Sequence, residues 1–116
     1  RIQAICDGVT AAFGATADVK YIYGYPPTVN HKAEADFATK VAQGVVGDDN
    51  VNPEFPPVIG AEDFSYMLEE RPGAYLMIGQ GDSAVLHHAE YDFNDELSPI
   101  GASYFVKLVE TAQPLR

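Results

Sequence analysis

The stretch Ala74-Tyr75-Leu76-Met77-Ile78-Gly79 decides the fold that the sequence predicts. This short, largely apolar run follows Pro72-Gly73, which stops a helical pattern, and it precedes a polar loop. A run of this length, bounded by turn residues, is typical of a buried strand. Helical patterns stand on both sides of it, so the sequence predicts an α/β fold.

Apolar spacing and turn residues predict the remaining elements. We expect, in chain order, a helix over 1–13, a strand over 16–25, helices over 31–46 and 61–70, the strand 74–79, and a last helix after Ser98. Pro26-Pro27 ends the first strand, because proline cannot donate to a ladder. One helix and one strand cannot bury both their faces. The part before the proline pair is therefore expected to associate with something larger.

The expected helices carry identifiable caps and apolar faces. Asn30 and Ser98 are the expected caps of the helices that follow them, and Gly14 is the expected stop of the first helix. The residues expected to face inward are Ile2, Ile5, Cys6, Val9 and Phe13, then Phe37, Val41 and Val45, then Phe64, Met67 and Leu68, then Ile100, Tyr104, Phe105, Leu108 and Val109.

Composition excludes some classes of partner. The chain of 116 residues is 47% hydrophobic and 21% charged, which is typical of a globular protein, and its net charge is −10. Because nucleic acids and anionic membranes attract Lys and Arg, neither is an expected partner. The single Cys6 cannot form an internal disulfide. A cytoplasmic location is the expectation.

The segment Leu86-His87-His88-Ala89-Glu90-Tyr91-Asp92-Phe93-Asn94-Asp95 holds two of the three histidines, beside several carboxylates. That composition fits a metal or acid/base site, and it equally fits a solvated polar loop. Residues 60–65 are a second candidate, because Glu62 and Asp63 stand at a predicted helix start near a sheet end. His31 is more simply an exposed residue at a helix start.

Other motifs are absent or incomplete. Asp48-Asp49-Asn50-Val51-Asn52 resembles the start of a calcium loop, but Pro53 stands where glycine is needed and Ile59 where glutamate is needed. No Gly-x-Ser-x-Gly elbow and no paired cysteine occurs. Nucleophilic catalysis by Ser or Cys therefore has no support.

A specific resemblance emerges from several motifs taken in order. They are Gly24-Tyr25-Pro26-Pro27-Thr28-Val29-Asn30, Gly60-Ala61-Glu62-Asp63-Phe64-Ser65-Tyr66-Met67, Pro72-Gly73-Ala74-Tyr75, Ile78-Gly79, Leu86-His87-His88, Tyr91-Asp92-Phe93-Asn94-Asp95 and Pro99-Ile100-Gly101-Ala102. Together they resemble the C-terminal end of the hippurate hydrolase and indole-acetyl-amino-acid hydrolase family. These are metal-dependent amidohydrolases of the aminoacylase and carboxypeptidase group.

The resemblance implies a division of the chain. Residues 1–27 would be the last helix and strand of an inserted lid domain, and 28–116 the C-terminal part of a zinc-peptidase-like catalytic domain. The chain would correspond to roughly the last third of such an enzyme. The expected partners are a small N-acyl amino acid substrate, the rest of the enzyme and a second copy bound through the lid domain.

The resemblance also implies site residues. His87, directly after Leu86, would bind one of the divalent metals, manganese or zinc, whereas His88 occupies a variable position. Asp63, Asp92 and Asp95 are the candidates to orient the imidazole, and Glu62 joins them near the site. Asn30 would lie near the cleft, where it could bind the polar end of the substrate.

The family's other ligands and its general base are not in this sequence. They come from a His-x-Cys-Gly-His-Asp segment, a Glu-Glu pair that also supplies the general base, and a further His, which are expected upstream. One imidazole cannot fill a metal coordination sphere, so the chain is expected to be inactive alone. The alternative is a non-catalytic α/β module that binds a metal or a protein partner through the His87 loop.

Overall fold

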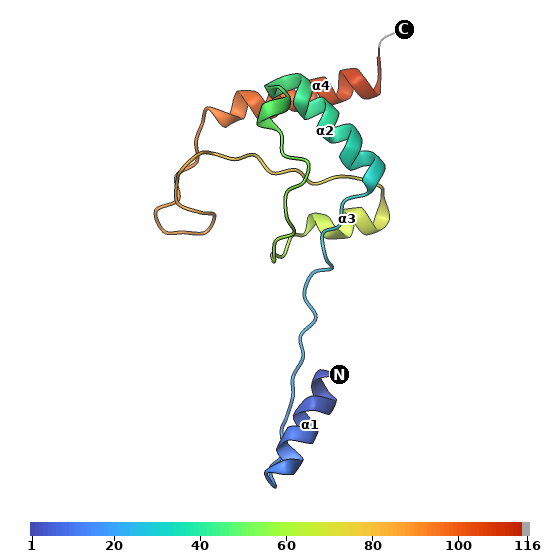
Figure 1. The fold of residues 1–116 in the computed structure, drawn as a ribbon, viewed down its shortest axis with the longest axis vertical. Coiled ribbons are helices and arrows are strands. Elements are labelled where there is room, and N and C mark those ends of the chain that lie inside the picture. The colour runs from blue at the N-terminus through green and yellow to red at the C-terminus, as the bar shows by residue number, and fades with distance from the viewer. Residues whose placement is uncertain (115–116) are drawn as a thin grey trace.

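The computed structural model describes residues 1–114, and its regular elements are helices (Figure 1). They are α1 (Ile2–Ala12), α2 (Lys32–Val46), the short 3-10 helix η1 (Asp48–Asn50), α3 (Phe64–Glu70) and α4 (Leu97–Ala112). No β-strand forms within residues 1–114. The predicted helices are present, whereas the predicted α/β class is not confirmed by residues 1–114.

The two predicted strands lack neighbours in the described structure. Residues 16–25 and 74–79 belong to no helix or strand, and Figure 1 shows 16–25 as an extended connection. A strand is stabilised by hydrogen bonds to an adjacent strand, and no such ladder forms among residues 1–114. The side-chain pattern cannot supply the neighbouring strand, so the two predicted strands are not confirmed within residues 1–114.

Helix α2 is the centre of the packing. It lies against α4 and η1, and these are the helix pairs that contact one another in the described range. Ala38 and Val41 on α2 are only 4% and 3% exposed, which confirms the buried position predicted for Val41. On α4, the half-buried residues are Leu97, Gly101, Tyr104 and Leu108. Phe105 and Val109, which were predicted to face inward, are exposed by 66% and 58%.

A second apolar contact forms between α3 and the chain that follows it. Leu68 is 6% exposed, and a side chain placed at Gly73 would lie 3.2 Å from its Cδ2 atom. Glycine at position 73 thus lets the chain turn back closely over α3. Ser65 is fully buried, and its hydroxyl donates a 2.6 Å hydrogen bond to the carbonyl of Glu62. Met67 is 64% exposed, so its predicted inward position was wrong.

The helix ends are set by groups that differ from the predicted caps. The residue before α2 is His31, and Asn30 makes no capping bond there. Helix α4 begins before Ser98, because the backbone N–H of Glu96 donates to Asn94 Oδ1 at 3.0 Å and starts the turn earlier. Gly14 and Gly47 follow α1 and α2 with φ of 63° and 86°, which suits glycine at a helix end.

Helix α1 stands away from the other helices. It lies at the far end of the extended segment, with Ile5, Val9 and Phe13 more than half exposed (Figure 1). Edge-to-face contact between Tyr25 and Tyr66, with ring centroids 5.7 Å apart, ties the end of that segment to α3. The assignment of 1–27 to a separate domain stays a prediction.

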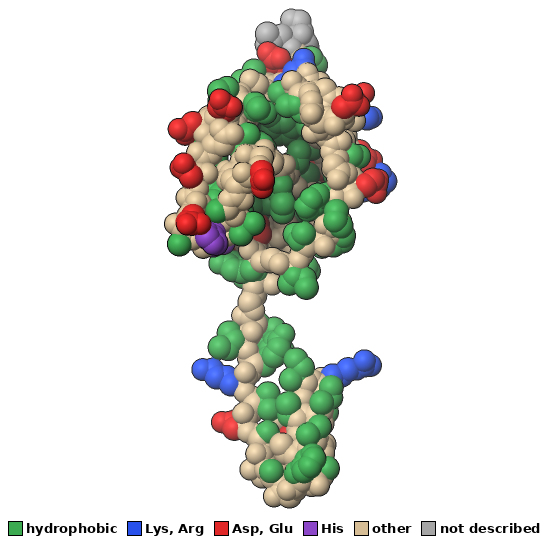
Figure 2. Space-filling model, turned by 60° about the vertical axis from the view of Figure 1, so that its left-hand side comes forward, with side chains coloured by type: hydrophobic (Ala, Val, Ile, Leu, Met, Phe, Trp, Pro, Cys, Tyr) green, Lys and Arg blue, Asp and Glu red, His purple; other side chains and the backbone are tan. Residues whose placement is uncertain are grey.

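The chain exposes far more surface than a compact domain of its mass. Its accessible surface is 10050 Å² for 12.6 kDa, against about 6,200 Å² for a folded monomer of that mass. Its radius of gyration is 20.7 Å, against about 13 Å for a compact domain of this length. Figure 2 shows hydrophobic side chains on the surface of the part that holds α1 and of the part that holds α2, α3 and α4. Hydrophobic side chains also line a hollow of the second part.

We therefore expect the isolated chain to lack a cooperative unfolding transition. Three hydrophobic side chains are buried in the described range, Ala38, Val41 and Leu68, and their burial cannot offset the conformational entropy of so long a chain. Circular dichroism during heating should show a gradual loss of helix, and a hydrophobic dye should bind at room temperature. A sharp transition with a large heat-capacity change would contradict this expectation.

Candidate functional site

The carboxamide of Asn30 pairs with the backbone of Tyr75. Asn30 Nδ2 donates to the Tyr75 carbonyl at 2.9 Å, and Asn30 Oδ1 accepts from the Tyr75 N–H at 2.7 Å. The amide side chain thus satisfies the same two groups that a neighbouring strand would satisfy. This pairing spans 45 residues of sequence, so it fixes the approach to α2 against the segment that follows α3.

His31 continues the same pairing. Its backbone N–H donates to the Gly73 carbonyl at 3.1 Å, and its Nδ1 accepts from the Gly73 N–H at 3.2 Å. An accepting Nδ1 is unprotonated, so the other ring nitrogen carries the proton when the imidazole is neutral. The side chain of His31 therefore contacts the backbone of Gly73. This contact agrees with the prediction that His31 is a residue at a helix start.

Glu62 is held at the beginning of α3 by both of its carboxylate oxygens. Oε1 accepts from the Phe64 N–H at 3.2 Å, and Oε2 accepts from the Tyr75 hydroxyl at 3.1 Å. The first contact satisfies an N–H that the helix leaves free, as a capping group does. The second contact ties α3 to the segment that Asn30 also holds.

The hydrogen bonds of Glu62 and Tyr75 shift the pKa values of both side chains. The hydrogen bond from the Phe64 N–H, followed by bonding with Asp63 and the Tyr75 hydroxyl, lowers the pKa of Glu62 below its usual value. Burial, reinforced by the adjacent Glu62 carboxylate, raises the pKa of Tyr75. At neutral pH the carboxylate is charged and the phenol is protonated, which is the combination in which the phenol donates.

The loop that carries the histidines closes through short turns. The N–H of His88 donates to the Val85 carbonyl at 3.1 Å, so residues 85–88 form a turn with His87 at its third position. His87 has a φ of 68°, the one positive value at a non-glycine residue in the described range. Such a conformation usually favours glycine. A non-glycine residue in this conformation is a backbone outlier, and such an outlier supports the hypothesis of a functional role.

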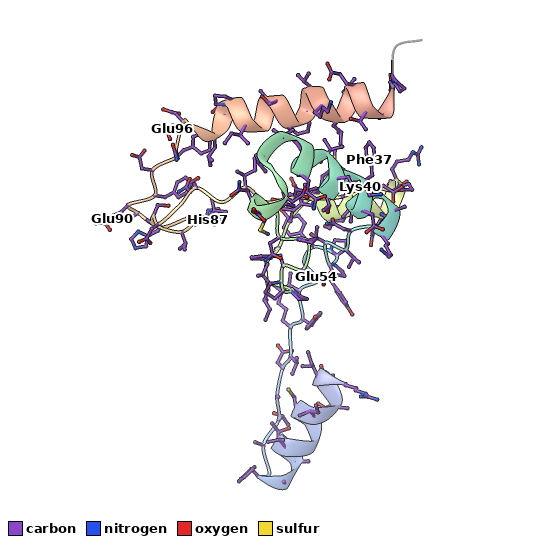
Figure 3. The ribbon with its side chains drawn as sticks, turned by 45° about the horizontal axis from the view of Figure 1, so that its top comes forward. Phe37, Lys40, Glu54, His87, Glu90 and Glu96 are labelled. Atoms are coloured by element: carbon purple, nitrogen blue, oxygen red, sulfur yellow. The ribbon has the colours of Figure 1, made fainter. Side chains whose placement is uncertain are left out.

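The two neighbouring imidazoles differ in their contacts. His88 Nδ1 accepts from the Glu90 N–H at 3.1 Å, so this ring is fixed within its own turn. The imidazole of His87 has no hydrogen-bond partner among residues 1–114 and is exposed. His87 and Glu90 lie on the loop that stands to one side of the helices (Figure 3). Both ring nitrogens of His87 are thus without a partner among residues 1–114, whereas Nδ1 of His88 is engaged within its own turn.

The side chain of Gln80 joins the two ends of this loop by hydrogen bonds. Gln80 Nε2 donates to Ser83 Oγ at 2.7 Å and to the Asp92 carbonyl at 3.3 Å, and Gln80 Oε1 accepts from the Tyr91 hydroxyl at 3.2 Å. Residues 80 and 91–92 are therefore held together across the loop. The carboxylate of Asp92 is exposed, and Asp95 lies at the start of α4, where its carbonyl accepts from the Ser98 N–H at 3.1 Å.

The described residues do not form a metal site by themselves. No group of three His, Cys, Asp or Glu residues that could hold a metal ion occurs within residues 1–114. His87 is one available imidazole ligand, and a metal site needs at least three protein ligands. The donor set of this part of the chain therefore does not fit a complete metal centre.

The structure brings together some of the predicted site residues and leaves others apart. Asn30 and Glu62 meet at Tyr75. Asp92 and Asp95 follow His87 in the segment that leads to α4. Glu62 and Asp63, at the start of α3, are not brought to the His87 loop, which stands apart from α3 in Figures 1 and 3. Their role near a metal stays a prediction.

Sequence reasoning missed Tyr75, Gln80 and Ser65. Tyr75 was assigned to the strand and occurs within the matched motif Pro72-Gly73-Ala74-Tyr75, so its place in that motif was the available signal. Ser65 stands in the matched motif of residues 60–67, and Gln80 stands in none of the matched motifs. Nothing in local sequence indicates that their polar groups close contacts within this part of the fold.

Comparison with known proteins decides the family. Residues 3–111 match Peptidase family M20/M25/M40. The chain belongs to this family. Peptidases of family M20 are generally metal-dependent. The recognised resemblance to hippurate and indole-acetyl-amino-acid hydrolases is thereby confirmed.

Several curated relatives in family M20 resemble this chain. Hippurate hydrolase of Campylobacter jejuni is 32% identical over 108 residues, which cover 93% of this chain and 28% of the relative. N-acetyl-L-cysteine deacetylase of Bacillus subtilis is 34% identical over 99% of this chain and 26% of its own length. IAA-amino acid hydrolase ILR1-like 4 of Arabidopsis thaliana is 36% identical over 68% of this chain and 19% of its own length.

Two further findings concern the extent of the match. The chain spans about a quarter of the length of the curated relatives that it matches. No solved structure matches the chain. Within residues 1–114, none of the helices combines the length and the apolar character that crossing a bilayer requires.

The pairing of Asn30 with Tyr75 predicts that Asn30→Asp destabilises the full-length protein. Aspartate keeps the oxygen that accepts from the Tyr75 N–H, but it cannot donate to the Tyr75 carbonyl and places a charge against that oxygen. We expect a loss of about 1 kcal/mol in the free energy of unfolding, measured by denaturant titration.

The matched control is Asn52→Asp. Asn52 Oδ1 accepts from the Glu54 N–H at 3.0 Å, which an aspartate can also do. The control should therefore change stability much less. Equal effects of the two substitutions would contradict the proposed importance of the amide pairing.

Proposed function

We propose that this chain is the C-terminal part of a metal-dependent amidohydrolase that cleaves N-acyl amino acids into a carboxylic acid and an amino acid. The match to peptidase family M20 over residues 3–111 carries this proposal. The names of the relatives support the substrate class, since a hippurate hydrolase, an N-acetyl-L-cysteine deacetylase and an IAA-amino acid hydrolase all act on acylated amino acids or their conjugates.

The whole enzyme would include protein outside these residues. The chain covers 28% of the Campylobacter jejuni relative, and the described residues hold no complete set of metal ligands. The remaining ligands and the general base would then come from upstream segments. The extended residues 74–79, with Met77 and Ile78 exposed by 65% and 52%, would be covered by strands of that remainder and so complete an α/β catalytic domain.

Residues 1–27 would be the last helix and strand of an inserted lid domain. Tyr21, Ile22 and Tyr23 are exposed by 59%, 75% and 87%, although such side chains usually bury at least one face of a sheet. Sheet neighbours from the rest of the lid would cover them, and a second copy of the enzyme would associate through the same domain. The cytoplasm is the proposed location, which rests on the single Cys6 of the sequence.

His87 is the residue of this chain that we assign to metal binding. It follows Leu86 in the matched motif, its imidazole is exposed, and its backbone has the left-handed conformation. The ion would be manganese or zinc. Neutral imidazole is a ligand for both, so His87 does not distinguish between them.

The first test measures hydrolysis by the full-length protein. Purified with manganese or zinc, it should release benzoate from hippurate or acetate from N-acetyl amino acids, whereas residues 1–116 alone should release neither. The difference is expected because a single imidazole cannot hold the ion. Turnover by the 116-residue chain, after controls with chelator for contaminating enzymes, would contradict the proposal.

The second test compares the two histidines. In the full-length protein, His87→Ala should lower kcat by at least about 100-fold and reduce the bound metal, whereas His88→Ala should do so much less. Bound metal is measured by plasma emission spectrometry on dialysed protein. The matched control His88→Ala removes a ring fixed in its own turn. Wild-type activity and metal content in His87→Ala would remove the assignment.

The alternative function is a non-catalytic module that binds a metal or a protein through the His87 loop. The same measurements separate it from the enzyme. A full-length protein that binds the metal through His87, yet hydrolyses no N-acyl amino acid, would favour the alternative. The reading frame upstream of Arg1 gives an independent test, because an enzyme of this family should encode the His-x-Cys-Gly-His-Asp and Glu-Glu segments there.

A further inference from the structure

Tyr75 is the point at which two of the predicted site residues meet. Asn30 precedes α2 and Glu62 precedes α3, so they come from separate parts of the sequence. Each makes hydrogen bonds to Tyr75 and not to the other: Asn30 pairs with its peptide groups, and Glu62 accepts from its hydroxyl. Tyr75 therefore links the position of Asn30 to the position of Glu62.

The two ends of Tyr75 are both fixed. Its N–H and carbonyl are 2.7 and 2.9 Å from the Asn30 carboxamide, and its hydroxyl is 3.1 Å from Glu62 Oε2. Between them, its ring packs against Phe64 with the ring centroids 5.6 Å apart. A planar ring with few rotatable bonds, held at both ends, transmits position better than a flexible side chain would.

We propose that Tyr75 is a positioning residue, which holds the Glu62 carboxylate in a fixed relation to Asn30. This inference rests on the proposed hydrolase function. Glu62 has two contacts that fix its carboxylate, the Phe64 N–H and the Tyr75 hydroxyl. Without the hydroxyl, Oε2 loses its partner, and the carboxylate can rotate about the contact that remains.

The burial of Tyr75 supports a donating role for its hydroxyl. Burial and the neighbouring Glu62 raise the pKa of the phenol, so it stays protonated well above neutral pH. A protonated phenol facing an ionised carboxylate forms a charge-assisted hydrogen bond, which is stronger than a neutral one. The donor and the acceptor are therefore both in the required protonation state at neutral pH.

The test is a double-mutant cycle between Tyr75→Phe and Glu62→Ala in the full-length protein. Tyr75→Phe removes the hydroxyl but keeps the ring against Phe64 and the backbone that pairs with Asn30, so the variant should fold. We expect kcat for an N-acyl amino acid to fall about 10-fold, with KM changed by less than about threefold, because an orienting contact to a charged group is lost.

The double variant identifies the route of this effect. If the hydroxyl acts through Glu62, adding Tyr75→Phe to Glu62→Ala should cause no further fall in kcat. The matched control is Tyr66→Phe on α3. Tyr66 is 50% exposed, its ring contacts Tyr25, and its hydroxyl has no hydrogen-bond partner within residues 1–114. Tyr66→Phe should leave kcat and KM at the wild-type values.

The outcomes separate this inference from the proposed function. Wild-type kcat in Tyr75→Phe, or an equal fall with and without Glu62, would overturn the positioning role while the hydrolase assignment stands. If the wild-type protein hydrolyses no N-acyl amino acid, the proposed function fails. The same cycle measured on the free energy of unfolding then decides the contact: coupling between the two positions supports it, and additivity overturns it.

Discussion

The described structure depends on the two contacts that hold helix α2. Along its length, α2 packs against α4 and buries Ala38 and Val41. At its beginning, Asn30 and His31 pair with the segment 73–75, which follows α3. The first contact is apolar and non-directional, whereas the second is a set of hydrogen bonds that fixes register. Together with the Tyr25–Tyr66 ring contact, the second aligns α3 with the beginning of α2.

The same contacts explain which polar groups gather at one place. Pairing of Asn30 with the Tyr75 backbone brings the tyrosine ring over Phe64 and its hydroxyl to Glu62. The histidine loop is organised separately, by the turn at 85–88 and by the contacts of Gln80 with Ser83, Tyr91 and Asp92. Two locally ordered polar regions thus lie on either side of the exposed residues Leu76, Met77 and Ile78. In the proposed enzyme, a sheet through these residues would set the distance between the two regions.

Local sequence predicted well those features that depend on neighbouring residues. The helices over α1, α2 and α4 were expected within a few residues of their ends, because apolar spacing and terminal glycines act over one or two turns. Several motifs taken in order led to the hippurate hydrolase and indole-acetyl-amino-acid hydrolase family, and the comparison confirmed this resemblance. Asn30 was expected as a cap, and it pairs instead with a residue 45 positions away. Its carboxamide suits both roles, so only the distant partner decides between them.

Sequence by itself predicted the family, which the comparison confirmed, and the helices. Tertiary structure alone decided that Tyr75 joins Asn30 to Glu62, and that 16–25 and 74–79 form no strand within residues 1–114. The physical reason is the same in both cases. A helix satisfies its backbone hydrogen bonds within its own segment, whereas a strand or a polar side chain needs a partner from elsewhere. Local sequence encodes the need for that partner but not its identity.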